Sequence, residues 1–104
     1  METTAIDSDF ILTTLKSLNQ RLRDEFAISQ IGLYGSFARN EQTPSSDIDL
    51  VFSVADSHFL SISERERLQR ILRRRLGRKL DLANEKMMNP FVKYAMQKDV
   101  IYVQ

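Results

Sequence analysis

The strongest constraint on the fold comes from residues 47–52, where acidic and apolar side chains alternate at the start of the segment. A repeat of two predicts a β-strand, because successive side chains of a strand point to opposite faces of the sheet. Asp47 and Asp49 should therefore lie on the same face. The opposite face should be buried and should carry Ile48, Leu50 and Phe52. We expect a sheet with one apolar face and one face that bears paired carboxylates.

Further helices and strands are predicted on both sides of this strand. Apolar residues at helical spacing follow a capping residue, Asp7 or Ser8, and Gly77 stands where a later helix should end. Asn89 followed by Pro90 is typical of a helix start. The predicted helices cover residues 7–24, 37–41, 61–76 and about 90–98, and the predicted strands cover residues 28–34, 47–54, 79–83 and 100–103. This order, αβαβαβαβ, indicates an α+β domain in which helices pack against a small mixed β-sheet.

The size and composition of the chain fit one globular domain, residues 1–104. Hydrophobic residues make up 42% and charged residues 28%, which argues against disorder. The absence of cysteine excludes disulfides and thiolate metal sites. The N-terminus lacks the basic and apolar segments of a signal peptide, and no apolar run approaches the roughly 20 residues that span a bilayer. We therefore expect a soluble, cytoplasmic protein with no membrane partner.

Charge is nearly balanced overall but uneven along the chain. The formal net charge is +1, so general attraction to nucleic acid should be weak. Residues 65–79 nevertheless form a basic stretch beside two acids, Glu64 and Glu66. Its basic members are Arg65, Arg67, Arg70, Arg73, Arg74, Arg75, Arg78 and Lys79. Such a helix face binds a partner protein, binds nucleic acid or is simply solvated, and the sequence leaves these alternatives open. The single histidine, His58, is expected to be a solvated loop residue rather than a catalytic base.

Residues 33–36, Leu-Tyr-Gly-Ser, predict a strand that ends in a turn suited to phosphate. Gly35 lets the backbone turn sharply and approach a ligand closely. The free N–H groups of a helical turn that begins there would attract an anion, and the hydroxyl of Ser36 adds a donor. Taken alone, the same residues also fit an ordinary strand-to-helix turn.

The two aspartates suggest a metal site. Carboxylates as close as Asp47 and Asp49 repel each other unless a cation bridges them, and Mg²⁺ prefers carboxylate and phosphate oxygens. A lone Asp-x-Asp is more often a pair of solvated side chains. Here ten residues separate Ser36 from Asp47, and the combined pattern Gly-Ser-x10-Asp-x-Asp should arise by chance in roughly one chain of this length in a thousand. The two halves together predict a site for Mg²⁺ and a phosphate group.

Residues 35–50, GSFARNEQTPSSDIDL, resemble the signature of the DNA polymerase beta-like nucleotidyltransferase superfamily, and more narrowly that of the minimal nucleotidyltransferases, or MNT proteins. The flanking residues that match the usual text GSxARGExxxxSDIDL are Ala38, Arg39, Glu41, Ser46 and Ile48. Asn40 departs from it, because the group usually has glycine there. Asparagine is the non-glycine residue that best tolerates a positive φ, so we expect the turn to be kept.

The resemblance implies the roles of the site residues. It calls for a third carboxylate from a later strand, and Asp81 stands at that place. Two Mg²⁺ ions would be held by Asp47, Asp49 and Asp81, with ATP as the nucleotide substrate. Asp81 would also accept a proton or orient a metal. Gly35 and Ser36 would hold the β- and γ-phosphates.

Two roles remain open within this resemblance. Arg39 would either reach a phosphate or pair on the surface with Glu41 or Glu25. The acceptor is open as well. MNT proteins are commonly antitoxins that transfer AMP to a tyrosine of a HEPN-type toxin ribonuclease. We therefore expect an AMPylating antitoxin in a hetero-oligomer with such a toxin. The alternatives are an antitoxin that only masks the toxin by binding, and a nucleotidyltransferase for RNA ends or a small molecule, which the lack of an added substrate domain disfavours.

Overall fold

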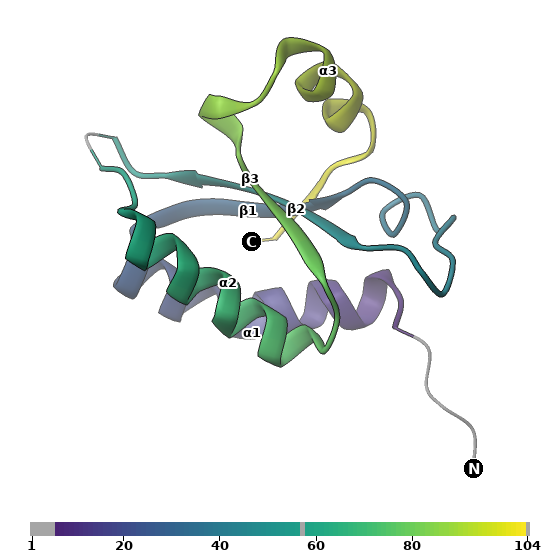
Figure 1. The fold of residues 1–104 in the computed structure, drawn as a ribbon, viewed down its shortest axis with the longest axis horizontal. Helices are drawn as coiled ribbons and strands as arrows, with labels where there is room; N and C mark the ends of the chain where they lie inside the picture. The colour runs from purple at the N-terminus through teal and green to yellow at the C-terminus, as the bar shows by residue number, and fades with distance from the viewer. Residues whose placement is uncertain (1–5, 57, 104) are drawn as a thin grey trace.

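Two helices cover one face of a four-stranded sheet, and a third helix stands on the other face (Figure 1). The computed structural model describes residues 6–56 and 58–103. The helices are α1 (Ser8–Phe26), α2 (Ile62–Leu76) and α3 (Pro90–Asp99), with a 3-10 turn η1 (Glu85–Met87) before α3. The strands are β1 (Ile28–Tyr34), β2 (Ile48–Val54), β3 (Leu80–Asn84) and β4 (Ile101–Tyr102).

The expectations about membranes and targeting are tested only in part. The prediction that the N-terminus is not a signal peptide concerns residues 1–10. Of these, residues 1–5 lie outside the described ranges. Among the described residues, none of the helices has both the length and the apolar content that crossing a membrane requires.

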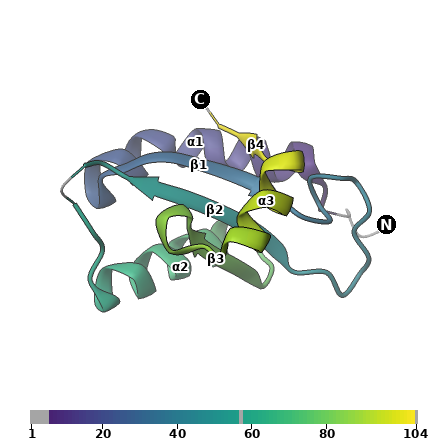
Figure 2. The ribbon, with the colours of Figure 1, turned by 90° about the horizontal axis from the view of Figure 1, so that it is seen from above.

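The sheet is mixed, in the order β3-β2-β1-β4. Strand β1 runs antiparallel to β2 and β4, whereas β2 and β3 are parallel and are joined through α2, the kind of crossover a parallel pair requires. Seen from above, α3 lies over the sheet, with α1 and α2 beneath it (Figure 2). The predicted α+β class, with helices on a small mixed sheet, is confirmed.

The core lies between the sheet and the two helices beneath it. Helix α1 turns its apolar stripe toward the sheet, and α2 does the same with Leu68, Leu72 and Leu76. The strands contribute the residues predicted to face inward. Among them are Ile48, Leu50 and Phe52, which are at most 1% exposed. Because the apolar side chains occupy this face, the acidic side chains that alternate with them are directed to the opposite face, on which α3 stands.

The helix ends follow the predicted capping residues, and α2 has a further cap that was not predicted. Asp7 caps α1, as predicted, and Ser61 caps α2 as part of a capping box. Gly77 ends α2 in the left-handed conformation, at a φ of 68°. Asn89 caps α3, whose first residue is proline. Only the end of α1 differs clearly, because the helix continues to Phe26 instead of stopping at residue 24.

The helical turns predicted over residues 37–41 are formed only in part, because hydrogen-bonded turns and no regular helix occupy the segment. The N–H of Arg39 donates to the carbonyl of Gly35 at 3.1 Å, four residues back as in an α-helix, but the N–H of Glu41 donates to the carbonyl of Ser36 at 2.8 Å, five residues back. Asn40 has a φ of 60° and redirects the chain out of the turn. The order of the regular elements is therefore αββαβαβ, with η1 as a short element that the sequence reading missed.

The positive φ of Asn40 predicts how this position responds to substitution. Asn40→Gly should leave the free energy of unfolding nearly unchanged. Asn40→Ala should lower it by about 1 kcal/mol, because a Cβ without local hydrogen bonding is strained in this conformation. Ala27, at a φ of 58°, is the reverse control, since Ala27→Gly should raise stability by about the same amount. Urea unfolding measures all three, and equal losses for Asn40→Gly and Asn40→Ala would contradict the backbone explanation.

Candidate active site

The predicted site residues meet on the sheet face that carries α3, where β1 ends and β2 and β3 begin. Asp49 on β2 is paired in register with Tyr34 of β1 on one side and with Asp81 of β3 on the other. Paired residues on neighbouring strands, about 4.8 Å apart, direct their side chains to the same face. Asp49 and Asp81 therefore share one face, as predicted, while Leu80 and Leu82 are buried on the other.

Gly35 brings the end of β1 against the carboxylate of Asp49. The residue has a φ of +79°, and a Cβ placed on it would lie 2.2 Å from Oδ2 of Asp49. Only glycine allows both this backbone conformation and this close approach. Ser36 follows directly and is partly exposed. The two halves of the motif are thus in contact, although thirteen positions separate Gly35 from Asp49 in the chain.

The electrostatics of the site centre on Asp49. Burial raises the pKa of Asp49, the negative charges of Asp81 and then Asp47 raise it further, and Arg39 lowers it. A half-buried carboxylate between two others is unfavourable in its charged form. A bound cation would remove this repulsion, so the arrangement fits a metal site better than an ordinary polar surface.

Asp47 lies just before β2 and is exposed, so the strand begins one residue later than predicted. Pairing with β3 starts at Ile48, whose N–H donates to the carbonyl of Lys79 at 3.0 Å. The loop before Asp47 is held by Arg78, which donates to the carbonyl of Ser46 at 2.8 Å and also to the carbonyl of Pro44. One arginine of the basic stretch therefore has a local structural role beside the site.

The carboxylates of the site could supply some, but not all, of the ligands of Mg²⁺. Across residues 6–56 and 58–103, no three His, Cys, Asp or Glu side chains are close enough together to surround an ion by themselves. Mg²⁺ does not require such a cage, because it keeps several waters and is commonly bound by one or two carboxylates together with substrate phosphates. Asp49 and Asp81 supply two carboxylates on one face, and Asp47 lies near enough to raise the pKa of Asp49. These oxygen donors match the chemistry that Mg²⁺ prefers.

Arg39 is held by two carboxylates. Its Nε donates to Glu41 and its Nη1 donates to Asp99, both at 2.9 Å. Hydrogen bonds to Glu41 and then to Asp99 raise the pKa of Arg39, so it stays charged. The predicted pairing with Glu41 is confirmed. The alternative partner Glu25 is wrong, because Glu25 is bonded to Arg21 and Arg67 on α1 and α2.

Two residues of the site were missed from the sequence, Tyr34 and Asp99. Tyr34 precedes the glycine and is the in-register neighbour of Asp49; burial, followed by the charges of Asp49 and Asp81, raises its pKa to about 12. Its position next to Gly35 in a predicted strand could have indicated its place. Asp99 accepts a hydrogen bond from the N–H of Gly35 at 3.2 Å, across 64 positions of sequence, and no local pattern indicates that contact.

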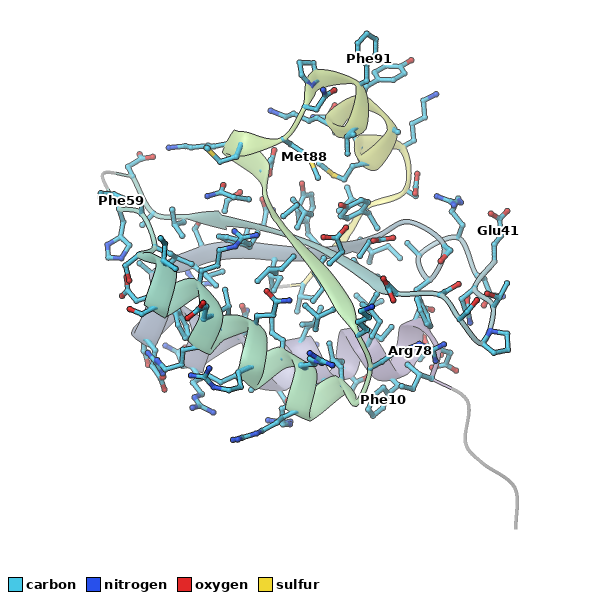
Figure 3. All side chains as sticks on the ribbon, viewed as in Figure 1. Phe10, Glu41, Phe59, Arg78, Met88 and Phe91 are labelled. Atoms are coloured by element: carbon cyan, nitrogen blue, oxygen red, sulfur yellow. The ribbon has the colours of Figure 1, made fainter. Side chains whose placement is uncertain are left out.

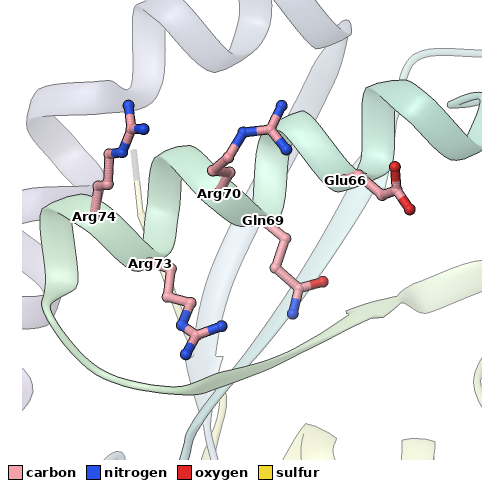
Figure 4. A pocket seen from close by; sticks show the side chains of 5 residues that line it. All are labelled: Glu66, Gln69, Arg70, Arg73 and Arg74. Atoms are coloured by element: carbon pink, nitrogen blue, oxygen red, sulfur yellow. The ribbon is translucent and has the colours of Figure 1, made fainter.

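The arginines of α2, which make up most of the basic stretch, lie away from these carboxylates. Arg67 and Arg75 tie α2 to α1 through Glu25 and Ser17, and Arg65 donates to the carbonyl of Leu82. A shallow depression of about 490 Å³ on α2 is lined by Glu66, Gln69, Arg70, Arg73 and Arg74 (Figure 4). Helix α2 covers the opposite face of the sheet, so this depression is not part of the site (Figure 1). His58 is exposed after β2, as predicted.

Comparison with known proteins agrees with this geometry. The family model described as a nucleotidyltransferase domain matches residues 15–103. A predicted protein adenylyltransferase of Methanocaldococcus jannaschii is 39% identical over 90 residues, which are 86% of this chain and 90% of the relative. The fold and the site are those of a nucleotidyltransferase. The matches to the family model and to the relative, each over most of the chain, identify the family. The chain belongs to the nucleotidyltransferase domain family.

Solved structures support the same fold. A toxin–antitoxin structure with AMP-PNP has a TM-score of 0.72 and 23% identity, covering 89% of this chain and 72% of that chain. A complex of the AMPylated HEPN toxin of Shewanella oneidensis with MNT antitoxin has a TM-score of 0.66 and 20% identity, covering 90% and 71%. These likenesses confirm the expected fold, in which helices pack against a small mixed sheet.

Proposed function

We propose that residues 1–104 form a single minimal nucleotidyltransferase domain that transfers AMP from ATP to a tyrosine of a HEPN-type toxin, and that the protein acts in the cytoplasm as the antitoxin of that toxin. The observation that carries the proposal is the position of Asp49. Its carboxylate contacts the Gly35 turn, and Asp49 pairs in register with Asp81. The proposed metal ligands therefore lie next to the proposed phosphate-binding turn. That arrangement suits nucleotidyl transfer.

Each site residue has a role in this proposal. Asp47, Asp49 and Asp81 would hold two Mg²⁺ ions, with the phosphates of the nucleotide and water as the other ligands. When bound, Mg²⁺ neutralises the triphosphate and lowers the pKa of the attacking hydroxyl. Gly35 and Ser36 bind the β- and γ-phosphates through the turn after β1. The acceptor oxygen forms a bond to the α-phosphorus, the bond from that phosphorus to the bridging oxygen breaks, and pyrophosphate leaves. Asp81, which is exposed, accepts the proton of the hydroxyl.

The identity of the acceptor rests on the relatives. A relative that is 39% identical is a predicted protein adenylyltransferase, and structures of similar fold are toxin–antitoxin complexes, one of them with an AMPylated HEPN toxin. These proteins make a HEPN-type toxin the first acceptor to test.

One observation also fits a second candidate, an antitoxin that acts by binding alone. Large apolar side chains are exposed on η1 and α3: Met87 is 82% exposed, Phe91 86% and Tyr94 65%. Phe91 points away from the sheet at the outer end of α3 (Figure 3). Exposed apolar clusters of this kind mark protein-binding surfaces. Such a surface could bind the toxin in order to block it, and it could equally hold the toxin as the substrate of AMP transfer.

A labelling experiment tests the enzymatic proposal. The purified protein is incubated with α-labelled ATP, Mg²⁺ and lysate of its source cells. We expect label on one protein band, identified by mass spectrometry as a tyrosine adduct, and no label with the double variant Asp47→Ala/Asp49→Ala. The matched control Asp24→Ala/Asp56→Ala removes two exposed aspartates away from the site and should label normally. Label on RNA would instead indicate a terminal transferase, and the absence of label with any nucleotide or with Mn²⁺ would contradict the proposal.

A growth assay separates catalysis from masking. Cells that express the labelled acceptor as a toxin should be protected by the unchanged protein and by the control double variant. They should not be protected by Asp47→Ala/Asp49→Ala if AMP transfer is the means of neutralisation. Full protection by that variant, at equal protein level, would show that binding is sufficient.

A further inference from the structure

Asp99 connects the end of α3 to the turn that follows β1. Its Oδ2 accepts hydrogen bonds from the N–H of Gly35 at 3.2 Å and from Nη1 of Arg39 at 2.9 Å. The side chain is only 17% exposed, so the carboxylate is largely removed from water and depends on these two donors. Neither the motif nor the three predicted carboxylates includes this residue.

The backbone around Asp99 is fixed by the strand that follows it. Ile101 and Tyr102 of β4 pair with Leu33 and Gly32 of β1. The fit is tight, because a Cβ on Gly32 would lie 2.8 Å from the ring of Tyr102. The end of α3 is therefore held beside the end of β1, where the Gly35 turn begins, and Asp99 reaches that turn from a rigid position.

The hydrogen bonds of Arg39 leave most of its guanidinium available. A guanidinium carries five N–H donors in a fixed plane. Glu41 takes the Nε donor and Asp99 takes one donor of Nη1, so both donors of Nη2 and one of Nη1 remain for another acceptor. The Arg39 side chain is 46% exposed, which leaves it accessible to a ligand. An arginine whose orientation is set by two carboxylates is pre-organised to bind a phosphate.

We propose that Asp99 is a positioning residue for the triphosphate: it holds the Gly35 turn and the Arg39 guanidinium in the arrangement that receives the nucleotide phosphates. The inference rests on the proposed function, which assigns the Gly35 turn to phosphate binding, and it adds Arg39 to that turn as a second phosphate-binding group. Asp99 itself does not contact the nucleotide. Its effect passes through Arg39 and the backbone of Gly35, so it should act on nucleotide binding more than on the chemical step.

A comparison of KM and kcat tests this role. Asp99→Asn keeps the shape of the side chain but removes its charge. We expect the KM for ATP, and the dissociation constant of a non-hydrolysable ATP analogue, to rise about tenfold, the change expected for losing one hydrogen bond to a charged group. The value of kcat should change by less than about threefold. Asp24→Asn, the same substitution on the exposed side of α1, is the matched control and should keep the original KM.

A second substitution shows whether Asp99 acts through Arg39. In an Arg39→Ala background, Asp99→Asn should raise KM by clearly less than it does alone, because the guanidinium that it positions is gone. An equal effect in both backgrounds, or a loss of kcat without a change in KM, would overturn the proposal in favour of a general structural role. A lower KM for Asp99→Asn would also overturn it, since the carboxylate would then be an obstacle to the triphosphate.

The two proposals fail in different ways. If the unchanged protein neither binds the ATP analogue nor transfers AMP, the proposed function fails, and the role of Asp99 fails with it. If the unchanged protein binds and transfers while Asp99→Asn behaves like Asp24→Asn, only the role of Asp99 is overturned. Circular dichroism of each variant, recorded at the assay temperature, shows that the compared proteins are folded.

Discussion

Replacing Asp49 with asparagine should abolish nucleotidyl transfer and, at the same time, make the metal-free protein more stable. Transfer should fall by about a thousandfold or more, because a metal ion that has lost a central carboxylate no longer stabilises the charge that develops on the triphosphate. Stability should rise by on the order of 1 kcal/mol, because the half-buried charge of Asp49 is unfavourable beside Asp81 and Asp47. The substitution removes both the metal-binding carboxylate and the electrostatic repulsion that this carboxylate causes.

The direction of the pKa shift of Asp49 determines how the stability difference between the two proteins changes with pH. The pKa of Asp49 is raised in the folded protein, so between the unfolded and folded pKa values the folded state binds more protons and stability falls as pH rises. The penalty is complete only above the folded pKa of Asp49 and is absent below the unfolded one. The advantage of Asp49→Asn in the presence of a chelator should therefore grow as the pH rises through the folded pKa, and should disappear as the pH is lowered below about 4.

Thermal unfolding with and without Mg²⁺ and an ATP analogue supplies the control. The ligands should stabilise the unchanged protein but not Asp49→Asn, so the order of stability should reverse when they are added. An Asp49→Asn variant that is less stable than the unchanged protein in chelator at pH 7 would show that the carboxylate makes favourable contacts, and the repulsion argument would be wrong.

Gly35→Ala should inactivate the protein while leaving most of its stability. The added Cβ would lie 2.2 Å from Oδ2 of Asp49, so the carboxylate must move away. Displacement of a metal ligand by about an ångström reduces transfer by roughly a hundredfold or more. The positive φ adds a backbone strain of about 1–2 kcal/mol, which a domain of this size should tolerate.

Gly77→Ala is a matched control for this substitution. Gly77 has a φ of +68°, close to that of Gly35, but a Cβ there would meet nothing within 4 Å. The two variants should therefore lose similar amounts of stability in urea unfolding, while only Gly35→Ala loses transfer activity. Equal activity in both would contradict the contact between Gly35 and Asp49 as the reason for glycine at this position.

Much of the fold could be predicted because its signals are local. The alternation over residues 47–52, the apolar stripes of α1 and α2 and the caps at Asp7, Gly77 and Asn89 each depend on neighbours a few positions away. The helical turns expected over residues 37–41 formed only in part, because the positive φ of Asn40 ends the turn early.

The site was predictable where its residues lie close together in the sequence. Gly35, Ser36, Asp47 and Asp49 belong to one motif, and strand alternation alone placed Asp49 on the polar face. Asp81 was placed with them by resemblance to a family rather than by any pattern of its own. Its register with Asp49 depends on the parallel pairing of β2 with β3, which the sequence does not specify.

Only the tertiary structure decided which distant residues complete the site. Asp99 meets Gly35 and Arg39 because β4 returns to the far side of β1, in the order β3-β2-β1-β4. It likewise decided that Arg78 supports the loop before Asp47, whereas Arg70 and Arg73 lie on the opposite side of the sheet. The sequence by itself determined most of the helices and strands and the pattern Gly-Ser-x10-Asp-x-Asp, since the elements arise from short-range sterics and periodicity. The remaining contacts depend on strand order, a non-local choice made when the whole core packs.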